Sequence, residues 1–134
     1  MSTQALSSEP MFSKPSGSLG YVAVVMAFIT GVLHLLAATN AIQFSQLLAV
    51  LFVLNGLGFL GGIVVYLSRF WRRPLFLVAA AYSIVTILAL FPFQGWGIEA
   101  FYMGGSINPI AVITKAAEAV LAVCALYLYA TTEN

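Results

Sequence analysis

The sequence predicts an all-α fold, a polytopic four-helix transmembrane bundle with both termini on the cytoplasmic side (N-in/C-in). Of its 134 residues, 62% are apolar and only 7% are charged, against about 25% charged in a typical soluble domain. The apolar residues form four runs of roughly 17 to 22 residues, near the length needed to cross a bilayer. Each run is continuous, whereas the strands of a membrane barrel alternate apolar and polar residues.

The first membrane helix is predicted over residues 19–39, after a tail. Residues 1–18 are rich in Ser, Pro and Gly and are expected to form a mobile cytoplasmic tail. The apolar region of a cleaved signal peptide is usually about 7 to 15 residues long, shorter than this run. Because Thr39-Asn40-Ala41 is an acceptable cleavage site, a signal peptide stays open as the alternative to a retained helix.

The second helix is predicted over residues 46–67 and is followed by the clearest topological signal in the chain. Arg69, Arg72 and Arg73 stand there around Trp71. Short loops rich in Lys and Arg stay in the cytoplasm, and aromatic residues favour the membrane interface. Pro74 then suits the first turn of the next helix, where its missing N–H costs nothing.

The third and fourth helices are predicted over residues 75–91 and 109–130. The third is expected to stop at Pro92, because the residue before proline is biased away from the helical region. The loop 92–108 carries several aromatic residues and is expected to lie along the interface. Asn108 and Pro109 form a good N-cap and first-turn pair, and residues 131–134 form a short tail.

The orientation follows because successive loops lie on alternate sides of the membrane. If the arginine loop is cytoplasmic, both termini are inside and the loops 40–45 and 92–108 are outside. Neither of these two loops contains a Lys or an Arg. The expected location is the cell membrane, with multiple passes, and the bilayer is the first partner.

One face of each predicted helix carries small and polar residues, which is typical of helix–helix contacts in lipid. At about 1.5 Å per residue, the polar ones fall in one layer, roughly 7 to 13 Å below the outer surface. This predicts an intramembrane polar cluster of His34, Asn55, Thr86, Lys115 and Glu118. Thr30 and Tyr82 share faces with His34 and Thr86. Gly58 and Gly62 have the GxxxG spacing and are predicted to pack helices together.

Lys115 and Glu118 stand three residues apart and therefore share a helix face. An ionisable residue inside the membrane is a functional-site hypothesis by default. Three interpretations are open. The pair fixes helix packing as a structural ion pair, or it forms a proton- or ion-coupled site, because a low-dielectric environment penalises the charged form of either side chain. In the third, the Lys115 side chain extends to the lipid headgroups, and Glu118 pairs with His34 or Asn55 instead.

Other chemistry finds little support. The sequence has no Asp, nucleophile elbow, phosphate loop or HExxH motif, so an enzyme is not expected. His34 is the only histidine, which excludes bis-histidine haem within one chain, and no spacing supports a metal. No cofactor is predicted, and without a basic patch no nucleic-acid partner is either. Cys124 is the single cysteine and is expected to be a small buried hydrophobe.

Three short stretches carry a resemblance to a known group: Gly31-Val32-Leu33-His34-Leu35, Leu54-Asn55-Gly56-Leu57-Gly58-Phe59-Leu60-Gly61 and Thr114-Lys115-Ala116-Ala117-Glu118. With the arginine loop, they resemble uncharacterised small four-helix membrane proteins of archaea, especially haloarchaeal ones. That group implies the same fold and no assigned activity. The chain is also similar in size and helix count to small multidrug transporters, but those carry their acidic residue in the first helix.

Two functions follow from these observations. The first is a structural or accessory membrane subunit, packing through small-residue faces against copies of itself or within a larger membrane complex. The second is a small oligomeric ion- or proton-coupled transporter or channel that uses Glu118, Lys115 and His34.

Overall fold

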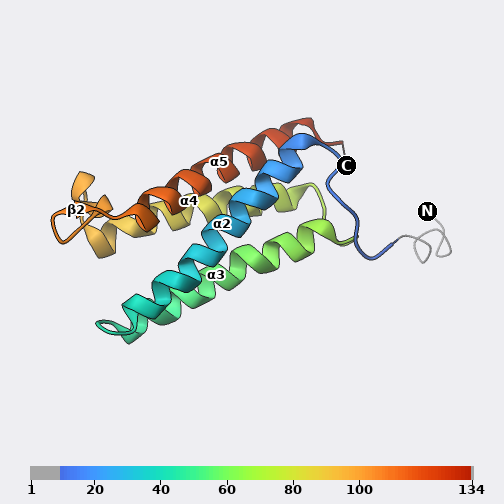
Figure 1. Ribbon diagram of the computed structural model, residues 1–134. Helices are drawn as coiled ribbons and strands as arrows, with labels where there is room; N and C mark the ends of the chain where they lie inside the picture. The colour runs from blue at the N-terminus through green and yellow to red at the C-terminus, as the bar shows by residue number, and fades with distance from the viewer. Residues whose placement is uncertain (1–9, 134) are drawn as a thin grey trace.

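The computed structural model describes residues 10–133 and contains four long helices (Figure 1). They are α2 (Ser18–Ala41), α3 (Gln46–Leu67), α4 (Pro74–Gln94) and α5 (Pro109–Thr131). All four are long and apolar enough to cross a membrane, which confirms the predicted fold class. Between α4 and α5 lie the 3₁₀ helix η1 (Ile98–Phe101) and the two short strands β1 (Tyr102–Met103) and β2 (Ser106–Ile107).

The helices begin where the sequence predicts. Ser45 caps α3, its side-chain oxygen accepting from the Leu48 N–H, and the Asn108 side chain caps α5 by accepting from the Ile110 N–H. Each cap satisfies one of the N–H groups that a helix start leaves without an internal partner. Pro74 and Pro109 occupy first-turn positions, where proline needs no hydrogen bond.

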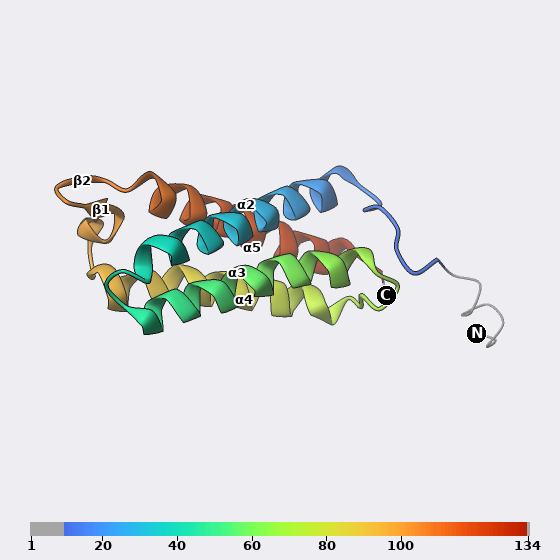
Figure 2. The same ribbon diagram turned by 60° about the horizontal axis from the view of Figure 1, so that its bottom comes forward.

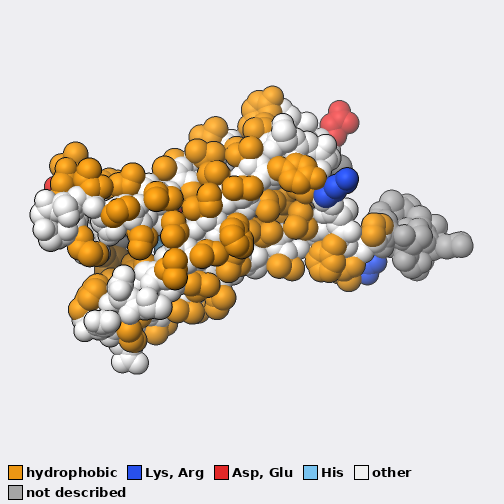
Figure 3. All heavy atoms as spheres, in the orientation of Figure 1, with side chains coloured by type: hydrophobic (Ala, Val, Ile, Leu, Met, Phe, Trp, Pro, Cys, Tyr) orange, Lys and Arg blue, Asp and Glu red, His pale blue; other side chains and the backbone are white. Residues whose placement is uncertain are grey.

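The helices form two hairpins, α2–α3 and α4–α5, that cross each other through α2 and α5. By contrast, the backbones of α3 and α4 do not pack closely, and these two helices meet through side chains. Figures 1 and 2 show the hairpins diverging toward the end that carries the α2–α3 turn and the β1–β2 loop. We call this the hairpin end, and the end with residues 10–17 and the loop 68–73 the arginine end. Figure 3 shows an apolar lateral surface, with the visible Lys and Arg side chains at the arginine end.

Helices α2 and α3 approach each other closely at Gly31 and Gly56. A Cβ added at Gly56 would lie 2.7 Å from the Gly31 carbonyl oxygen, so only glycine permits this crossing. Within the described part of this chain Gly62 packs against no other helix, since a Cβ there would meet nothing within 4 Å. Gly58 does allow a close contact, but with the Tyr82 side chain and not with a helix backbone. The GxxxG spacing marks a face without revealing what lies across from it.

The end of α4 differs from the prediction. Pro92 does not stop the helix, which continues to Gln94. Proline removes one backbone bond and crowds the carbonyl four residues earlier. Here it sits in the last turn, and the Gly95 N–H still bonds to the Phe91 carbonyl, so the helix closes normally beyond it.

The loop after α4 is ordered as a small hairpin. Tyr102 pairs with Ile107 and Met103 with Ser106. The turn between the strands is Gly104-Gly105, with φ of 61° and 85°, the left-handed region that two-residue hairpin turns require and glycine adopts most readily. Five large apolar side chains of the loop are exposed, as expected of a segment at an interface: Trp96, Ile98, Tyr102, Met103 and Ile107.

The predicted mobile tail is described only from Pro10 onward, and this part is not free. The Ser13 N–H bonds to the Leu67 carbonyl, and the Arg69 N–H bonds to the Met11 carbonyl. Phe12 and Ser68 thus form an isolated antiparallel bridge. The segment from Pro10 onward therefore has backbone contacts with the arginine loop that the prediction of a mobile tail did not include, and residues 1–9 lie outside the described part.

Candidate functional site: a buried ion pair at the floor of a cavity

The centre of the site is the ion pair between Lys115 and Glu118 on α5. The Lys115 Nζ lies 2.8 Å from Glu118 Oε1, as the three-residue spacing allows. Glu118 is completely buried and Lys115 is 9% exposed. The Lys115 ammonium also donates to the Thr86 carbonyl oxygen on α4, at 3.3 Å. Lys115 therefore points into the bundle, and the interpretation in which it snorkels to the headgroups is wrong.

The second carboxylate oxygen of Glu118 faces α2. The Thr30 hydroxyl donates to Oε2 at 2.5 Å, and His34 Nε2 lies 3.8 Å from the same oxygen. His34 Nδ1 is 2.8 Å from the Thr30 carbonyl oxygen. Because a carbonyl only accepts, Nδ1 carries the hydrogen of a neutral imidazole. Nε2 is then an unprotonated acceptor directed at Glu118, so a proton can bind between His34 Nε2 and Glu118 Oε2.

Helices α3 and α4 complete the network. The Thr86 hydroxyl shares its one hydrogen between Asn55 Oδ1 at 3.2 Å and the Tyr82 carbonyl at 2.9 Å. The Tyr82 hydroxyl donates to the Asn55 carbonyl oxygen at 3.0 Å. Side chains from all four helices thus meet in one hydrogen-bonded cluster. It contains every residue of the predicted polar cluster: His34, Asn55, Thr86, Lys115 and Glu118.

Two further residues join the site although they lie outside the predicted cluster. Thr30 is one helical turn before His34, and Tyr82 is one turn before Thr86. Both share an interior face with a predicted member, and this four-residue spacing is the signal that identifies them. Thr30 holds the carboxylate, while Tyr82 connects α4 to α3.

The charges of Lys115 and Glu118 are stabilised in the buried site because they are paired with each other. Both oxygens of Glu118 accept a hydrogen bond, from Lys115 and Thr30, and with neutral His34 the cluster has no net charge. A buried pair tolerates low dielectric only when its geometry is good and its remaining hydrogen-bonding groups are satisfied. Removal of either partner would leave an uncompensated charge.

A cavity of about 460 Å³ leads from the hairpin end to this cluster. Its polar lining residues near the cluster are His34, Asn55, Thr86 and Lys115. Glu118 is not among the lining residues, so Lys115 and His34 stand between it and the cavity. The walls are apolar, and polar amides contribute to the lining near the helix ends: Asn40, Gln94 and Asn108. Figure 3 shows the molecule hollowed at this end, between the two hairpins.

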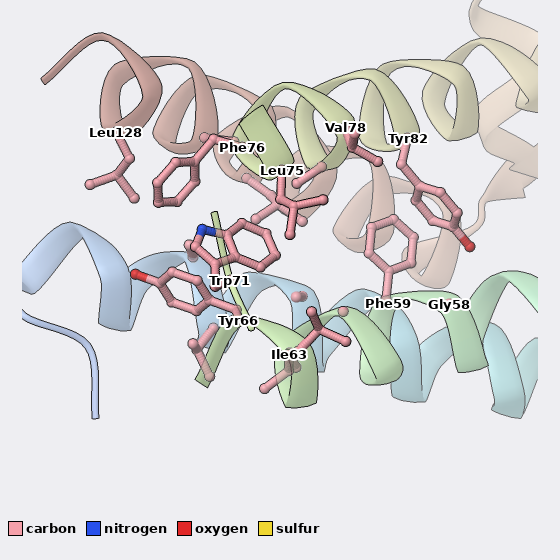
Figure 4. Close-up of a pocket in the computed structure, with 18 residues that line it drawn as sticks. Gly58, Phe59, Ile63, Tyr66, Trp71, Leu75, Phe76, Val78, Tyr82 and Leu128 are labelled. Carbon is pink, nitrogen blue, oxygen red and sulfur yellow. The ribbon is translucent and has the colours of Figure 1, made fainter. Parts of the chain in front are cut away.

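A second, smaller cavity of about 260 Å³ lies between α3 and α4 toward the arginine end. Figure 4 shows Tyr82 and Phe59 at one end of it and Tyr66, Trp71 and Phe76 at the other. Its lining is almost entirely apolar. Tyr82 lines both cavities, and its ring packs edge-on against Phe59 with centroids 4.9 Å apart. The Tyr82–Phe59 contact therefore separates the two spaces.

Comparison with protein families matches residues 6–129 to a Family of unknown function (DUF7475). The chain belongs to this family. No curated protein and no solved structure matches it. Four membrane-length helices and this family together describe a multi-pass membrane protein of unknown role. The family is uncharacterised, as the predicted resemblance implies, while the archaeal source stays a prediction.

The predicted topology residues lie together at the arginine end. Arg73 donates from Nε to the Tyr129 carbonyl oxygen at 2.9 Å and stacks over the Tyr129 ring at 4.0 Å. It thereby satisfies a carbonyl in the last turn of α5, where a helix favours a positive charge. Arg72 donates to the carbonyls of Arg69 and Trp71 within the loop. Arg69 stacks on Phe70.

Proposed function

We propose that this protein is a small proton-coupled transporter whose coupling site is the cluster of Lys115, Glu118 and His34. The observation that carries the proposal is the position of Glu118. Its carboxylate is completely buried, yet two of the side chains that contact or face it, Lys115 and His34, line a large cavity. A solute that enters the cavity meets these two residues, and any change in their charge acts directly on the carboxylate.

The shape of the interior supports the same function. The cavity is open at the hairpin end and ends at the cluster, while the Tyr82–Phe59 contact closes the way to the other cavity. Transport by alternating access needs such a site near mid-membrane, accessible from one side at a time. With the arginine loop in the cytoplasm, this conformation faces outward across the cell membrane.

The test uses the full chain reconstituted in liposomes that contain a pH-sensitive dye. Carboxylates, amines and alkali cations are added outside in turn, and the internal pH is followed. One class of solute should change the internal pH with wild-type protein and not with Glu118→Gln. Val123→Ala, a change on the lipid-facing side of α5, should behave as wild type because Val123 is 68% exposed.

Two controls make a negative result decisive. Size-exclusion profiles establish that Glu118→Gln is folded, and the double change Lys115→Met/Glu118→Gln supplies a second inactive protein without an unpaired charge. If no solute moves protons faster with wild-type protein than with either variant, the transport proposal is wrong.

A second candidate, an accessory subunit, is favoured by the apolar cavity between α3 and α4 in Figure 4. The backbones of these helices do not pack closely, and their exposed apolar side chains offer a surface that a neighbouring transmembrane helix could cover. Such a partner would be another membrane protein or a second copy of this chain. Purification in mild detergent tests this directly. A stoichiometric larger partner would favour the subunit, and a protein that is active alone in liposomes would exclude a purely accessory role.

A further inference from the structure

We infer that the cavity at the hairpin end binds a small amphipathic carboxylate, together with one proton that is taken up by the His34–Glu118 pair. The inference rests on the proposed transport function and names the solute class for it. Three features of the cavity support it: the hydrogen-bond donors near the cluster, the charge balance there, and the apolar walls.

The side chains near the cluster offer donors to an anion. The Lys115 ammonium has three N–H groups, and two protein acceptors are within reach, Glu118 Oε1 and the Thr86 carbonyl. Asn55 uses its Oδ1 with Thr86, and in the part of the chain that the structure describes its amide N–H₂ has no acceptor. No Asp or Glu is among the described lining residues. Two donors from α5 and α3 thus face a space without a competing carboxylate, as an anionic head group requires.

The charge balance explains the proton. Glu118 already neutralises Lys115, so a bound carboxylate would leave one uncompensated negative charge in a low-dielectric site, which is costly. A single proton on the His34–Glu118 pair restores neutrality, and the unprotonated Nε2 of His34 lies 3.8 Å from Glu118 Oε2 to receive it. The ionisable groups around this position are His34 from α2, Lys115 from α5 and Tyr82 from α4, while α3 contributes the uncharged Asn55.

The rest of the cavity fits an apolar body. Its walls come from all four helices and are mostly aliphatic and aromatic, with these large side chains from α3 and α4: Leu51, Phe52, Leu54, Val85, Leu90 and Phe93. A volume of about 460 Å³ is within the range of small-molecule sites, which are typically apolar with a few placed polar groups. An amine would meet the Lys115 ammonium, and a dianion would need a second proton. A monocarboxylate with a short hydrocarbon chain satisfies both the charge balance and the walls.

The test measures binding to the full chain in phospholipid nanodiscs by isothermal titration calorimetry, with empty nanodiscs subtracted. The probes are octanoate, octanol and octylamine, which share one chain length and differ in head group. Octanoate should bind at least about tenfold more tightly than octanol, since a hydrogen bond to a charged group contributes enough for that factor. Titrations in buffers of different ionisation enthalpy should show uptake of about one proton per octanoate.

Variants locate the site. Asn55→Ala should weaken octanoate binding while sparing octanol, and the double change Lys115→Met/Glu118→Gln should abolish the preference for octanoate without leaving an unpaired charge. Val123→Ala should bind as wild type. Equal binding of octanoate and octanol, preference for octylamine, or binding without proton uptake would each overturn the inference.

The outcomes for binding and transport are separable. If another solute class drives Glu118-dependent proton movement and octanoate does not bind, this inference fails and the transport proposal stands. If octanoate binds with proton uptake but no solute moves protons across the liposome, the transport proposal fails and the binding site stands.

Discussion

The Tyr82 hydroxyl donates a hydrogen bond of 3.0 Å to the backbone carbonyl oxygen of Asn55, and this bond joins α4 to α3 between the two cavities. That carbonyl lies inside a helix, so the bond fixes the tyrosine ring without using the Asn55 side chain. The ring also packs on Phe59 and over Gly58. The backbones of α3 and α4 do not pack closely, so side chains join them: Tyr82, the Thr86–Asn55 hydrogen bond and the Tyr66–Phe76 ring contact.

Replacing Tyr82 by Ala should open a passage between the cavities, because the ring that borders both is removed. A cysteine placed at Ala79, which lines the smaller cavity, reports the opening in a Cys124→Ala background. A membrane-impermeant thiol reagent added to intact cells should modify it only when Tyr82→Ala is present. A cysteine at Ala89, in the larger cavity, should react in both backgrounds. Unchanged protection at position 79 would show that Tyr82 does not separate the spaces.

Lys115 and Glu118 should be coupled in stability. Either Lys115→Met or Glu118→Gln strands the charge of its partner in a buried site, which costs about 3–5 kcal/mol. Glu118→Gln keeps the Thr30 contact and should cost less. The double change should recover much of the loss, since an uncharged replacement of a buried pair is often nearly neutral. Thermal unfolding in detergent measures the cycle, and strictly additive effects would contradict a direct pair.

The Gly31–Gly56 crossing should be intolerant of side chains. Gly56→Leu places a side chain against the Gly31 carbonyl oxygen and should destabilise by at least about 1–3 kcal/mol, the usual cost of overpacking. Gly62→Leu serves as the matched control, because a Cβ there meets nothing within 4 Å. It should unfold at nearly the wild-type temperature in the same detergent. A larger loss at Gly62 than at Gly56 would place the helix contact on the other face.

The orientation predicts which end an impermeant reagent reaches. With Cys124 replaced by Ala, single cysteines at the exposed positions Gln43 and Ser106 should be labelled in intact cells. Cysteines at Phe70 and Glu133, exposed at the arginine end, should be labelled only after the cells are opened. The reverse pattern would show that the arginine loop faces outward, against the bias of short basic loops for the cytoplasm.

The sequence predicts the helices well because bilayer thickness dictates their length. The observed α3 has the predicted bounds, and the other three differ by one to three residues at their ends. The polar cluster was also predictable, because the residue number determines both the helix face on which a side chain lies and its depth in the membrane. That His34 and Glu118 occupy one layer follows from counting residues.

What lies across from a face could not be predicted in this way. The GxxxG spacing pointed to Gly62, whereas the helix crossing uses Gly56, since several faces of α3 carry glycine and only α2 decides between them. The cavity depends on the angle between the two hairpins, which no local pattern encodes. The sequence also did not show that α4 continues past Pro92. A proline in the last turn is tolerated, and the end of the helix at Gln94 is known only from the structure.

The position of α5 between α2 and α4 has a consequence for biosynthesis. Helix α5 follows the other three from the ribosome, and it packs against both its hairpin partner α4 and α2 of the other hairpin. Lys115 and Glu118 can pair within α5 before docking, because they are three residues apart on the same helix. Until it arrives, Thr30 and His34 lack their acidic partner. A chain arrested before Pro109 would therefore expose polar helix faces to lipid, the kind of unassembled segment that membrane quality control degrades.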